Sequence, residues 1–212
     1  MKVCEIFTSI QGESTFAGQP CTFIRLSGCN LRCVYCDTQY SYEEGAEMEL
    51  GDIVRQVETA GVPLVEITGG EPLLQGEDTN ALIRALLDRD YRVLIETNGS
   101  MNIEGLDRRV TIILDMKTPG SGMSHRMDLT NLEKIKSTDE VKFVLSGRDD
   151  YAWSKDIVMR YGLEKKCVVL FSPAYGLLRP RELVSWMIED KLAVRLNIQI
   201  HKYIFGPAER GV

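Results

Sequence analysis

A regular alternation of short apolar runs with amphipathic segments is the feature that most constrains the fold of this chain. The apolar runs have the length and the Val, Ile and Leu content of β-strands, and they cover residues 22–27, 64–68, 92–97, 110–116, 140–146, 166–172 and 193–200. Segments with helical periodicity lie between them, at residues 49–61, 77–90, 150–162 and 179–191, with a shorter candidate at 129–135. Near-continuous apolar strands are typical of parallel sheets that are covered on both faces. The alternation therefore predicts an α/β fold with a parallel sheet and helices outside it.

The chain is predicted to form a single domain over residues 1–212. Its length suffices to bury a core, and 44% hydrophobic with 26% charged residues is usual for a folded protein. We find no repeat, low-complexity segment or linker. No apolar run approaches the roughly 20 residues of a membrane span, and the N-terminus lacks the features of a signal peptide. We therefore expect a cytoplasmic protein with no membrane partner.

The charge of the chain bears on its ligands. Thirty-one acidic residues against 25 basic ones give a net charge of −6, and the basic residues are dispersed. Binding to a nucleic-acid backbone requires clustered Lys and Arg, so the sequence predicts no nucleic-acid partner and favours a small molecule. In open α/β sheets such ligands bind at the carboxyl ends of the strands. The candidate site therefore comprises the polar segments that follow strands, at residues 28–39, 68–72, 97–100, 115–122 and 172–176.

Three cysteines lie close together in the pattern C-x3-C-x2-C, at Cys29, Cys33 and Cys36. In a cytoplasmic protein such a group indicates a metal or redox site in preference to a disulfide framework. The only two histidines, His125 and His201, are distant in the sequence. A centre held by three thiolates keeps one position free, and in a cubane iron–sulfur cluster that position is an iron able to bind a substrate or cofactor.

The alternative to a cluster is a zinc site. It would be completed by Cys4, Cys21 or a distant side chain. These two cysteines and Cys167 lie in apolar or strand-like surroundings, which favours a role as small core residues.

The segment TGGEP at residues 68–72 follows a predicted strand. Gly69 and Gly70 allow a close approach between the backbone and a ligand, and Glu71 can accept hydrogen bonds from an ammonium group. The cysteine pattern followed by this segment resembles the radical S-adenosylmethionine (radical SAM) superfamily. That resemblance implies a 4Fe–4S cluster on the three cysteines, with SAM bound to its fourth iron.

The resemblance extends over nearly the whole chain, to the 7-carboxy-7-deazaguanine synthase family. It is carried by the segments IFTSIQGES, CDTQY, TNGS, DMKTPGSGM and NIQIHKYIFGP. It implies a lyase that converts 6-carboxy-5,6,7,8-tetrahydropterin into 7-carboxy-7-deazaguanine with release of ammonia, on the pathway to queuosine and other 7-deazapurines. The implied fold is a partial (β/α)6 TIM-like barrel, which agrees with the alternation of strands and helices.

The resemblance also implies roles for individual residues. Cys29, Cys33 and Cys36 match the cluster ligands, and Thr38 matches a Mg²⁺ ligand. The SAM-contacting positions are Tyr35, Cys36, Asp37, Gly70, Glu71, Asp115, Met116, Lys117, Ser172, Pro173, Ala174 and Tyr175. The substrate-contacting positions are Ile10, Gln11, Gly12, Glu13, Arg25, Thr68, His201 and Pro207, which places contacts in an N-terminal segment of about residues 1–20 and a C-terminal tail of about residues 197–212. No side chain is implied as catalytic, because SAM and the cluster carry the radical chemistry.

Several of these residues have ordinary structural alternatives. Arg25 could pair with an acid at the edge of the core instead of binding the substrate carboxylate, which its planar guanidinium fits well. Thr38 could cap the turn after the cysteines, Asp115 could cap a loop, and His201 could be a histidine at the edge of the core. Their joint occurrence in the family's order favours the functional interpretation.

Two departures from the family pattern affect these assignments. Some members end at the proline that matches Pro207, whereas AERGV follows it here, so that only a backbone contact with the substrate is expected. Members often carry Ser-Pro-Lys where this chain has Asp115, Met116 and Lys117. An acid at position 115 can still accept a hydrogen bond from a ribose hydroxyl.

The family further implies Mg²⁺ as a cofactor, an electron donor such as flavodoxin, and a homodimer. A second enzyme class shares the cysteine spacing and the compact size, namely activases that install a glycyl radical in a partner protein. The segments IQGE, CDT and TNGS favour the synthase instead. A third hypothesis is a non-enzymatic zinc-binding module, which would have no need of the GGEP loop.

Overall fold

The computed structural model describes residues 1–207 and 210–211. Its strands are β1 (Lys2–Ile10), β2 (Pro20–Leu26), β3 (Ala46–Glu47), β4 (Leu64–Gly69), β5 (Arg92–Thr97), β6 (Thr111–Met116), β7 (Glu140–Leu145), β8 (Val168–Pro173) and β9 (Arg195–Leu196). They form a nine-stranded sheet in the order β3-β1-β2-β4-β5-β6-β7-β8-β9. β1 pairs antiparallel with β2 and β3, and each neighbouring pair from β2 to β9 is parallel. Residues 208, 209 and 212 of the predicted C-terminal tail lie outside the described residues.

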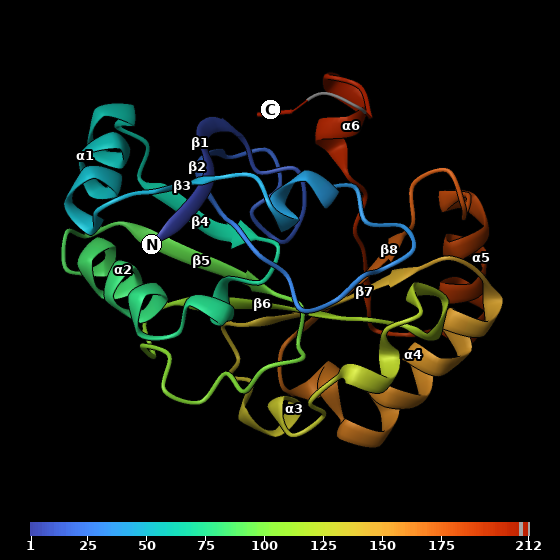
Figure 1. Cartoon of the computed structure of the whole chain (residues 1–212). Coiled ribbons are helices and arrows are strands. Elements are labelled where there is room, and N and C mark those ends of the chain that lie inside the picture. The colour runs from blue at the N-terminus through green and yellow to red at the C-terminus, as the bar shows by residue number, and fades with distance from the viewer. Residues whose placement is uncertain (208–209, 212) are drawn as a thin grey trace.

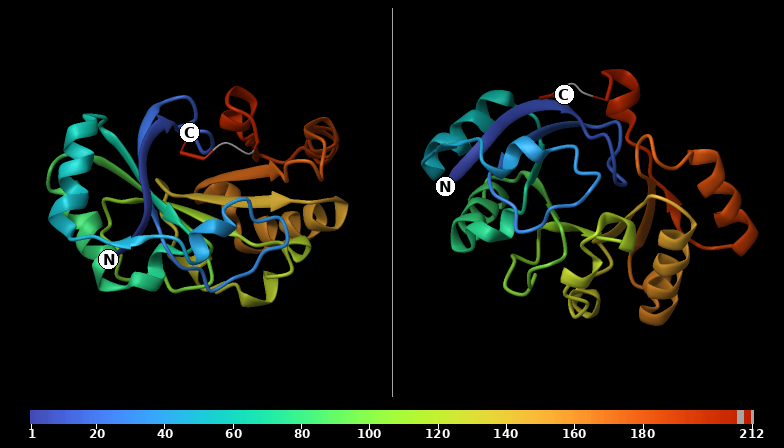
Figure 2. Two further views of the ribbon diagram at one scale, coloured as in Figure 1. Left: turned by 45° about the horizontal axis from the view of Figure 1, so that its top comes forward. Right: turned by 45° about the vertical axis from the view of Figure 1, so that its right-hand side comes forward.

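The helices are α1 (Leu50–Ala60), α2 (Glu77–Leu87), α3 (Asn131–Lys134), α4 (Arg148–Tyr161), α5 (Pro180–Asp190) and α6 (Ile200–Ile204). α1 to α5 lie along the outer side of the curved sheet (Figure 1). α6 lies instead beside the N-terminal hairpin of β1 and β2 (Figure 2). The Ile200 amide confirms that proximity, because it donates a hydrogen bond of 3.0 Å to the Gly12 carbonyl in the loop between β1 and β2.

The predicted partial barrel is confirmed. The sheet is open, with β3 and β9 at its two edges, and its strands from β2 onward follow one another in sequence order with helices between most of them. The predicted amphipathic helices pack on the core along one side. Ile53, Val54 and Val57 of α1 and Leu82 and Ile83 of α2 are all buried there.

Two terminal segments differ from the expectation. β1 was not predicted as a strand, because most of its residues are only half-buried and it therefore lacks a continuous apolar run. Of the predicted strand at 193–200, only β9 is a strand, and residue 200 already begins α6. Ile198 is 45% exposed there, so the apolar alternation of this segment does not mark a buried strand.

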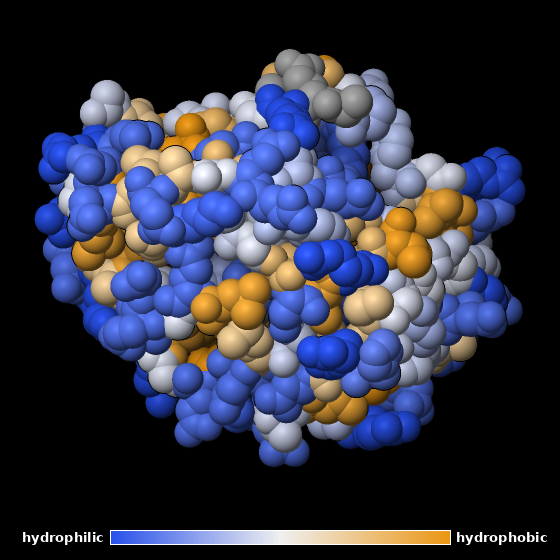
Figure 3. Space-filling model, in the orientation of Figure 1, coloured by the Kyte–Doolittle hydropathy of each residue, from blue (hydrophilic) through white to orange (hydrophobic). Residues whose placement is uncertain are grey.

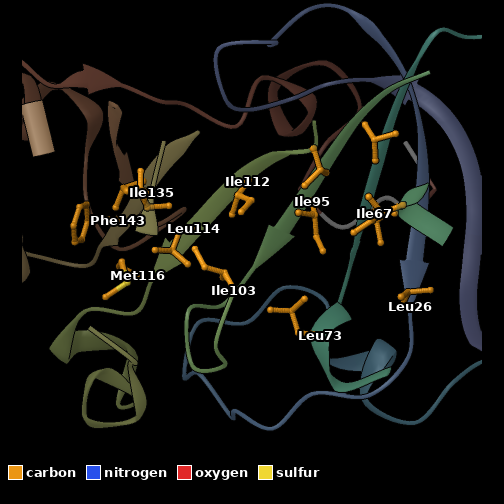
Figure 4. Close-up of a cluster of buried hydrophobic side chains, with 14 of the residues drawn as sticks. Leu26, Ile67, Leu73, Ile95, Ile103, Ile112, Leu114, Met116, Ile135 and Phe143 are labelled. Carbon is orange, nitrogen blue, oxygen red and sulfur yellow. The ribbon is translucent and has the colours of Figure 1, made fainter. Parts of the chain in front are cut away.

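The sheet has a different composition on each face. Its outer face packs on the helices through a large apolar cluster that includes Ile67, Ile95 and Leu114 (Figure 4). A smaller cluster lies apart from it and contains Cys21, Phe23, Leu64, Leu94 and Ile113. Side chains two residues apart on a strand point to the same face. The inner face therefore carries this small apolar cluster near the amino ends of the strands.

Charged residues follow that cluster along the inner face. Two residues after Phe23, Leu64, Leu94 and Ile113 come Arg25, Glu66, Glu96 and Asp115. Lys142 of β7 pairs in register with Asp115 of β6. On β2, β4, β5 and β6 an ionisable side chain thus follows an apolar one on the same face, toward the carboxyl end of its own strand, and we call these side chains together with Lys142 the ionisable layer.

The molecular surface is largely hydrophilic on the face shown in Figure 3, where apolar residues occur in separate patches. Within the described residues, no helix has both the length and the apolar character needed to cross a membrane.

Candidate functional site

A cavity of about 550 Å³ lies on the inner side of the sheet, at the carboxyl ends of the strands. All five segments that the sequence predicts as a site contribute to its lining. The predicted site residues on its wall are Ile10, Gln11, Gly12, Glu13, Arg25, Cys29, Cys33, Tyr35, Cys36, Asp37, Thr38, Thr68, Gly70, Asp115, Lys117, Ser172, Pro173, Ala174, Tyr175, His201 and Pro207. Residues that are distant in the sequence thus meet around a single space.

The three cysteines form part of this wall, and none is in a disulfide. Cys4, Cys21 and Cys167 are also free thiols, but they do not line the cavity. Within residues 1–207 and 210–211, no three His, Cys, Asp or Glu side chains are arranged to hold one metal ion. A tetrahedral zinc ion needs ligands that converge on a single point, whereas a cubane binds each thiolate to a different iron. Three free thiols on one cavity wall match the three thiolates expected for such a cluster in number.

Gly70 brings the GGEP loop directly against the cysteine loop. A Cβ atom on Gly70 would lie 2.1 Å from the Gly28 carbonyl oxygen and 2.8 Å from the Cys29 Cβ. Gly69 is similarly confined, since its φ is +150° and a Cβ there would lie 2.1 Å from the Leu26 carbonyl oxygen. Glycine at position 70 is thus required for the close approach of the two loops, and glycine at position 69 for the close approach of the GGEP loop to the end of β2.

Glu71 and Met116 are the two predicted SAM contacts whose residues do not line the cavity. Glu71 is fully buried and accepts hydrogen bonds from the Leu73 amide (2.9 Å), the Thr97 hydroxyl (2.8 Å) and the Asn98 amide (2.7 Å). Its carboxylate therefore ties the GGEP loop to the TNGS turn. Met116 is buried in the outer apolar cluster (Figure 4).

Lys142 is the centre of the ionisable layer. Its Nζ lies 3.1 Å from Glu13 Oε2 and 3.5 Å from Asp115 Oδ2, and it also donates to Glu96 Oε1. Burial disfavours the ammonium form, but the carboxylates of Glu13, Glu96 and Asp115 outweigh it, so that the pKa of Lys142 is well above its ordinary value. Lys142 is therefore a permanent cation.

The carboxyl groups around Lys142 have divergent pKa values. Burial raises the pKa of Glu13 and of Asp115, but nearby lysines outweigh it, so that both values are lower than usual. For Glu66, burial and then the charge of Glu96 raise the pKa well above its usual range. Burial also raises the pKa of Glu96. The cavity thus holds ionised carboxylates next to carboxyl groups that retain protons more readily.

The structure shows which contacts Thr38, Arg25 and Asp115 make, and these bear on the structural alternatives named for each residue. Thr38 precedes the 3-10 helix Gln39–Tyr42, but its side chain makes no capping hydrogen bond. Arg25 does pair with an acid, because its Nε donates to Glu5 Oε1 at 2.7 Å, and it lines the cavity as well. Asp115 Oδ2 accepts from Lys117 Nζ at 2.8 Å, whereas its Oδ1 is buried and has no hydrogen-bond partner among the described residues.

The C-terminal segment closes one side of the cavity. A Cβ atom on Gly12 would lie 1.9 Å from His201 Nδ1, so glycine lets α6 approach the loop after β1. Burial lowers the pKa of His201. Lys202 forms an ion pair with Asp37 and thereby connects α6 to the cysteine loop.

Three charged lining residues, Glu66, Glu96 and Lys142, lie outside the segments that the sequence predicts as a site. A signal for them is present, because each is a charged residue inside an otherwise largely apolar strand. A buried charge in a strand requires a partner or a ligand. Because side chains alternate between the two faces of a strand, the position of such a charged residue indicates which face of the sheet lines the site.

Comparison with known proteins gives consistent results. A family profile described as the Radical SAM superfamily matches residues 23–118. The 7-carboxy-7-deazaguanine synthase of Chlorobaculum tepidum is 44% identical, with 100% of this chain and 97% of the relative covered. The protein of the same name from Koribacter versatilis is 40% identical, with 100% of both covered. The crystal structure of QueE from Escherichia coli matches with a TM-score of 0.78 at 22% identity, over 93% of each chain, which is a likeness of fold.

Proposed function

This chain belongs to the 7-carboxy-7-deazaguanine synthase family of radical SAM enzymes, and on that basis we propose the reaction it performs. It is a lyase that converts 6-carboxy-5,6,7,8-tetrahydropterin into 7-carboxy-7-deazaguanine and ammonia, in the biosynthesis of queuosine and related 7-deazapurines. The observation that carries the proposal is that a single cavity joins the three free cysteines to a largely enclosed arginine suited to a carboxylate.

The family implies SAM and a 4Fe–4S cluster as cofactors. Cys29, Cys33 and Cys36 would hold the cluster, which supplies one-electron chemistry to SAM when both are bound. Gly70 keeps the neighbouring loop close to the cysteines. Asp115 Oδ1, which has no hydrogen-bond partner among the residues that the structure describes, provides a buried acceptor on the same wall, which suits a hydroxyl or amino group of a ligand.

The side chains of the chain bind and orient the pterin. Arg25 provides a planar, permanently charged group for the substrate carboxylate. Gln11, Thr68 and His201 line the same cavity and offer hydrogen-bonding groups to the polar edges of the ring. The apolar layer behind them, which contains Leu64, Leu94 and Ile113, closes the inner side of the sheet to water. The protein thus positions and shields the reacting atoms.

We also propose a Mg²⁺ ion next to Thr38. The Thr38 side chain is on the cavity wall and is not used as a cap. Mg²⁺ binds few protein ligands and completes its shell with water and substrate oxygens, so one hydroxyl near a substrate carboxylate is a sufficient anchor. Equilibrium binding of the carboxylated pterin, measured with and without Mg²⁺, tests the ion. Equal affinities in the two conditions would remove it from the proposal.

Further proposals concern the molecule as a whole. Residues 1–212 act as one radical SAM domain, in which the N-terminal loop and the C-terminal tail complete the substrate side. A small protein such as flavodoxin supplies the electron, and the protein works as a homodimer. Sedimentation of the reconstituted protein tests the last point.

The central experiment is a turnover assay without oxygen. The reconstituted protein receives SAM, dithionite or flavodoxin, and 6-carboxytetrahydropterin, and mass spectrometry follows the products. We expect 7-carboxy-7-deazaguanine and ammonia, both lost in Cys33→Ala and retained in Cys167→Ala, whose cysteine lies outside the cavity. Cleavage of SAM with the pterin left unchanged would contradict the proposed substrate and would favour a radical activase.

A further inference from the structure

Arg25 is held from the side by an acid on the neighbouring strand. Glu5 of β1 is directly opposite Arg25 of β2 in the antiparallel pair, and the Arg25 Nε donates to Glu5 Oε1 at 2.7 Å. The side chains are only 14% and 22% exposed, respectively. An ion pair enclosed in this way holds its geometry better than one on the surface, where most such pairs contribute little.

Glu5 is in turn held by Tyr40. The Tyr40 hydroxyl donates to the same Glu5 Oε1 atom at 2.8 Å. Tyr40 belongs to the 3-10 helix Gln39–Tyr42, which follows the cysteine loop directly. The rings of Tyr40 and Phe7 also flank the guanidinium, with centroids 5.9 and 5.8 Å from the Arg25 Cζ. Arg25 is thus fixed by one oxygen and two rings.

This arrangement leaves one edge of the guanidinium available. Nε is occupied by Glu5, whereas the two terminal nitrogens make no hydrogen bond within the described residues and are not among the buried unpartnered atoms there. Arg25 also lines the cavity, so these nitrogens are the groups that it can offer to a ligand there. A carboxylate in the cavity can therefore be bound through both terminal nitrogens, in the bidentate geometry that arginine favours.

We propose that Glu5 and Tyr40 are positioning residues, which aim the two terminal nitrogens of Arg25 at the carboxylate of the substrate. This inference rests on the proposed function, since it requires a carboxylated pterin. The positioning role and the charge of Glu5 have opposite consequences. As a charge, Glu5 competes with the substrate for Arg25, so its removal would strengthen binding. As a positioning group, it fixes the orientation of Arg25, so its removal would weaken binding.

The test compares two ligands on the anaerobically reconstituted holoenzyme. Equilibrium dissociation constants are measured for 6-carboxytetrahydropterin and for tetrahydropterin, which lacks the carboxylate. The variants are Glu5→Ala, Glu5→Gln and Tyr40→Phe. Glu77→Ala is the control, since Glu77 pairs with Arg84 on the exposed surface of α2.

We expect Glu5→Ala and Tyr40→Phe to weaken binding of the carboxylated pterin by about ten-fold, as for loss of a hydrogen bond to a charged group. Binding of tetrahydropterin should stay within about two-fold of wild type, because it makes no use of Arg25. Glu5→Gln keeps an acceptor oxygen for Nε and should retain most of the affinity. In an Arg25→Ala background, Glu5→Ala should have no further effect on either ligand.

Equal losses of affinity for the two pterins would overturn the inference. Tighter binding of the carboxylated pterin by the Glu5→Ala variant would overturn it as well. Wild-type affinity in Tyr40→Phe, which keeps the ring, would exclude the role of its hydroxyl. A wild-type protein that does not prefer the carboxylated pterin would instead count against the proposed function. A preference that survives in both Glu5→Ala and Tyr40→Phe would count against the positioning pair alone.

Discussion

At the scale of single residues, the molecule concentrates buried charge at Lys142. One ammonium group contacts carboxylates from the N-terminal loop, β5 and β6. Such a group is costly to remove, because charges left behind in the interior have no compensation. Its partners also differ in their readiness to ionise, which makes stability depend on pH.

Replacement of Lys142 by methionine should destabilise the protein by about 3–5 kcal/mol, because its carboxylate partners would lose their common cation. Urea denaturation of the apoprotein measures this change. Lys134→Met is the matched control, since Lys134 pairs with the exposed Glu104, and it should cost less than about 1 kcal/mol. Similar losses in the two variants would mean that Lys142 does not hold the carboxylates together.

Glu66 should make stability fall as pH rises. Its pKa in the folded protein is raised well above 4.5, the usual value, by burial and then by Glu96. The folded protein therefore keeps a proton that the unfolded chain has released, and stability declines from about pH 4.5 up to the raised pKa. Glu66→Gln should lessen this decline, so that its stability relative to wild type increases with pH. Denaturation at several pH values checks the difference, which a purely steric effect would leave constant.

At the scale of elements, much of the architecture was predictable from apolar runs. Strands such as β5 are near-continuous and buried on both faces, and they were found at the predicted residues. β1 was missed because an antiparallel strand near the sheet edge is half-exposed and has no such run. The cysteine and GGEP loops could be predicted from their motifs. The clustering of Lys142 with acids of other strands could not, since it depends on register across the sheet.

Gly70→Ala should lower the affinity for SAM by at least about ten-fold. A Cβ there would lie 2.1 Å from a backbone oxygen, so the loop must move away from the cysteines, and displacements of about 1 Å have large effects on binding geometry. Equilibrium binding to the reconstituted enzyme measures the change. Gly51→Ala, in α1, should leave the affinity unaltered. Unchanged affinity in Gly70→Ala would show that the two loops need not touch.

At the scale of the whole molecule, the loop after β1 and the segment with α6 meet at the cavity although the sheet is open. The loop after β1 and the segment with α6 are joined by the Ile200–Gly12 hydrogen bond. The Lys202–Asp37 ion pair adds a connection to the cysteine loop. The cavity is therefore completed by parts of the chain that lie outside the run of parallel strands.

Gly12→Ala should release α6 from the N-terminal loop. The added Cβ would lie 1.9 Å from His201 Nδ1 and 3.0 Å from its Cβ, so His201 must move, and its Cβ couples that movement to the helix. Amide hydrogen exchange should become faster at residues 200–206, while α4 serves as an internal reference that keeps its rates. Exchange that stays slow at residues 200–206 would show that the histidine ring alone moves aside.

The alternation of side chains between the two faces of each strand also limits which insertions and deletions this protein can accept in evolution. Ile95 faces the helices and Glu96 faces the cavity, so one inserted residue early in β5 would exchange their sides. The same insertion would bury a carboxylate among the helices and place an isoleucine beside Lys142. Single insertions and deletions in the central strands therefore disturb every following side chain of the strand, whereas a substitution alters one position. Related sequences are expected to vary in length in their loops and to keep the length of these strands constant.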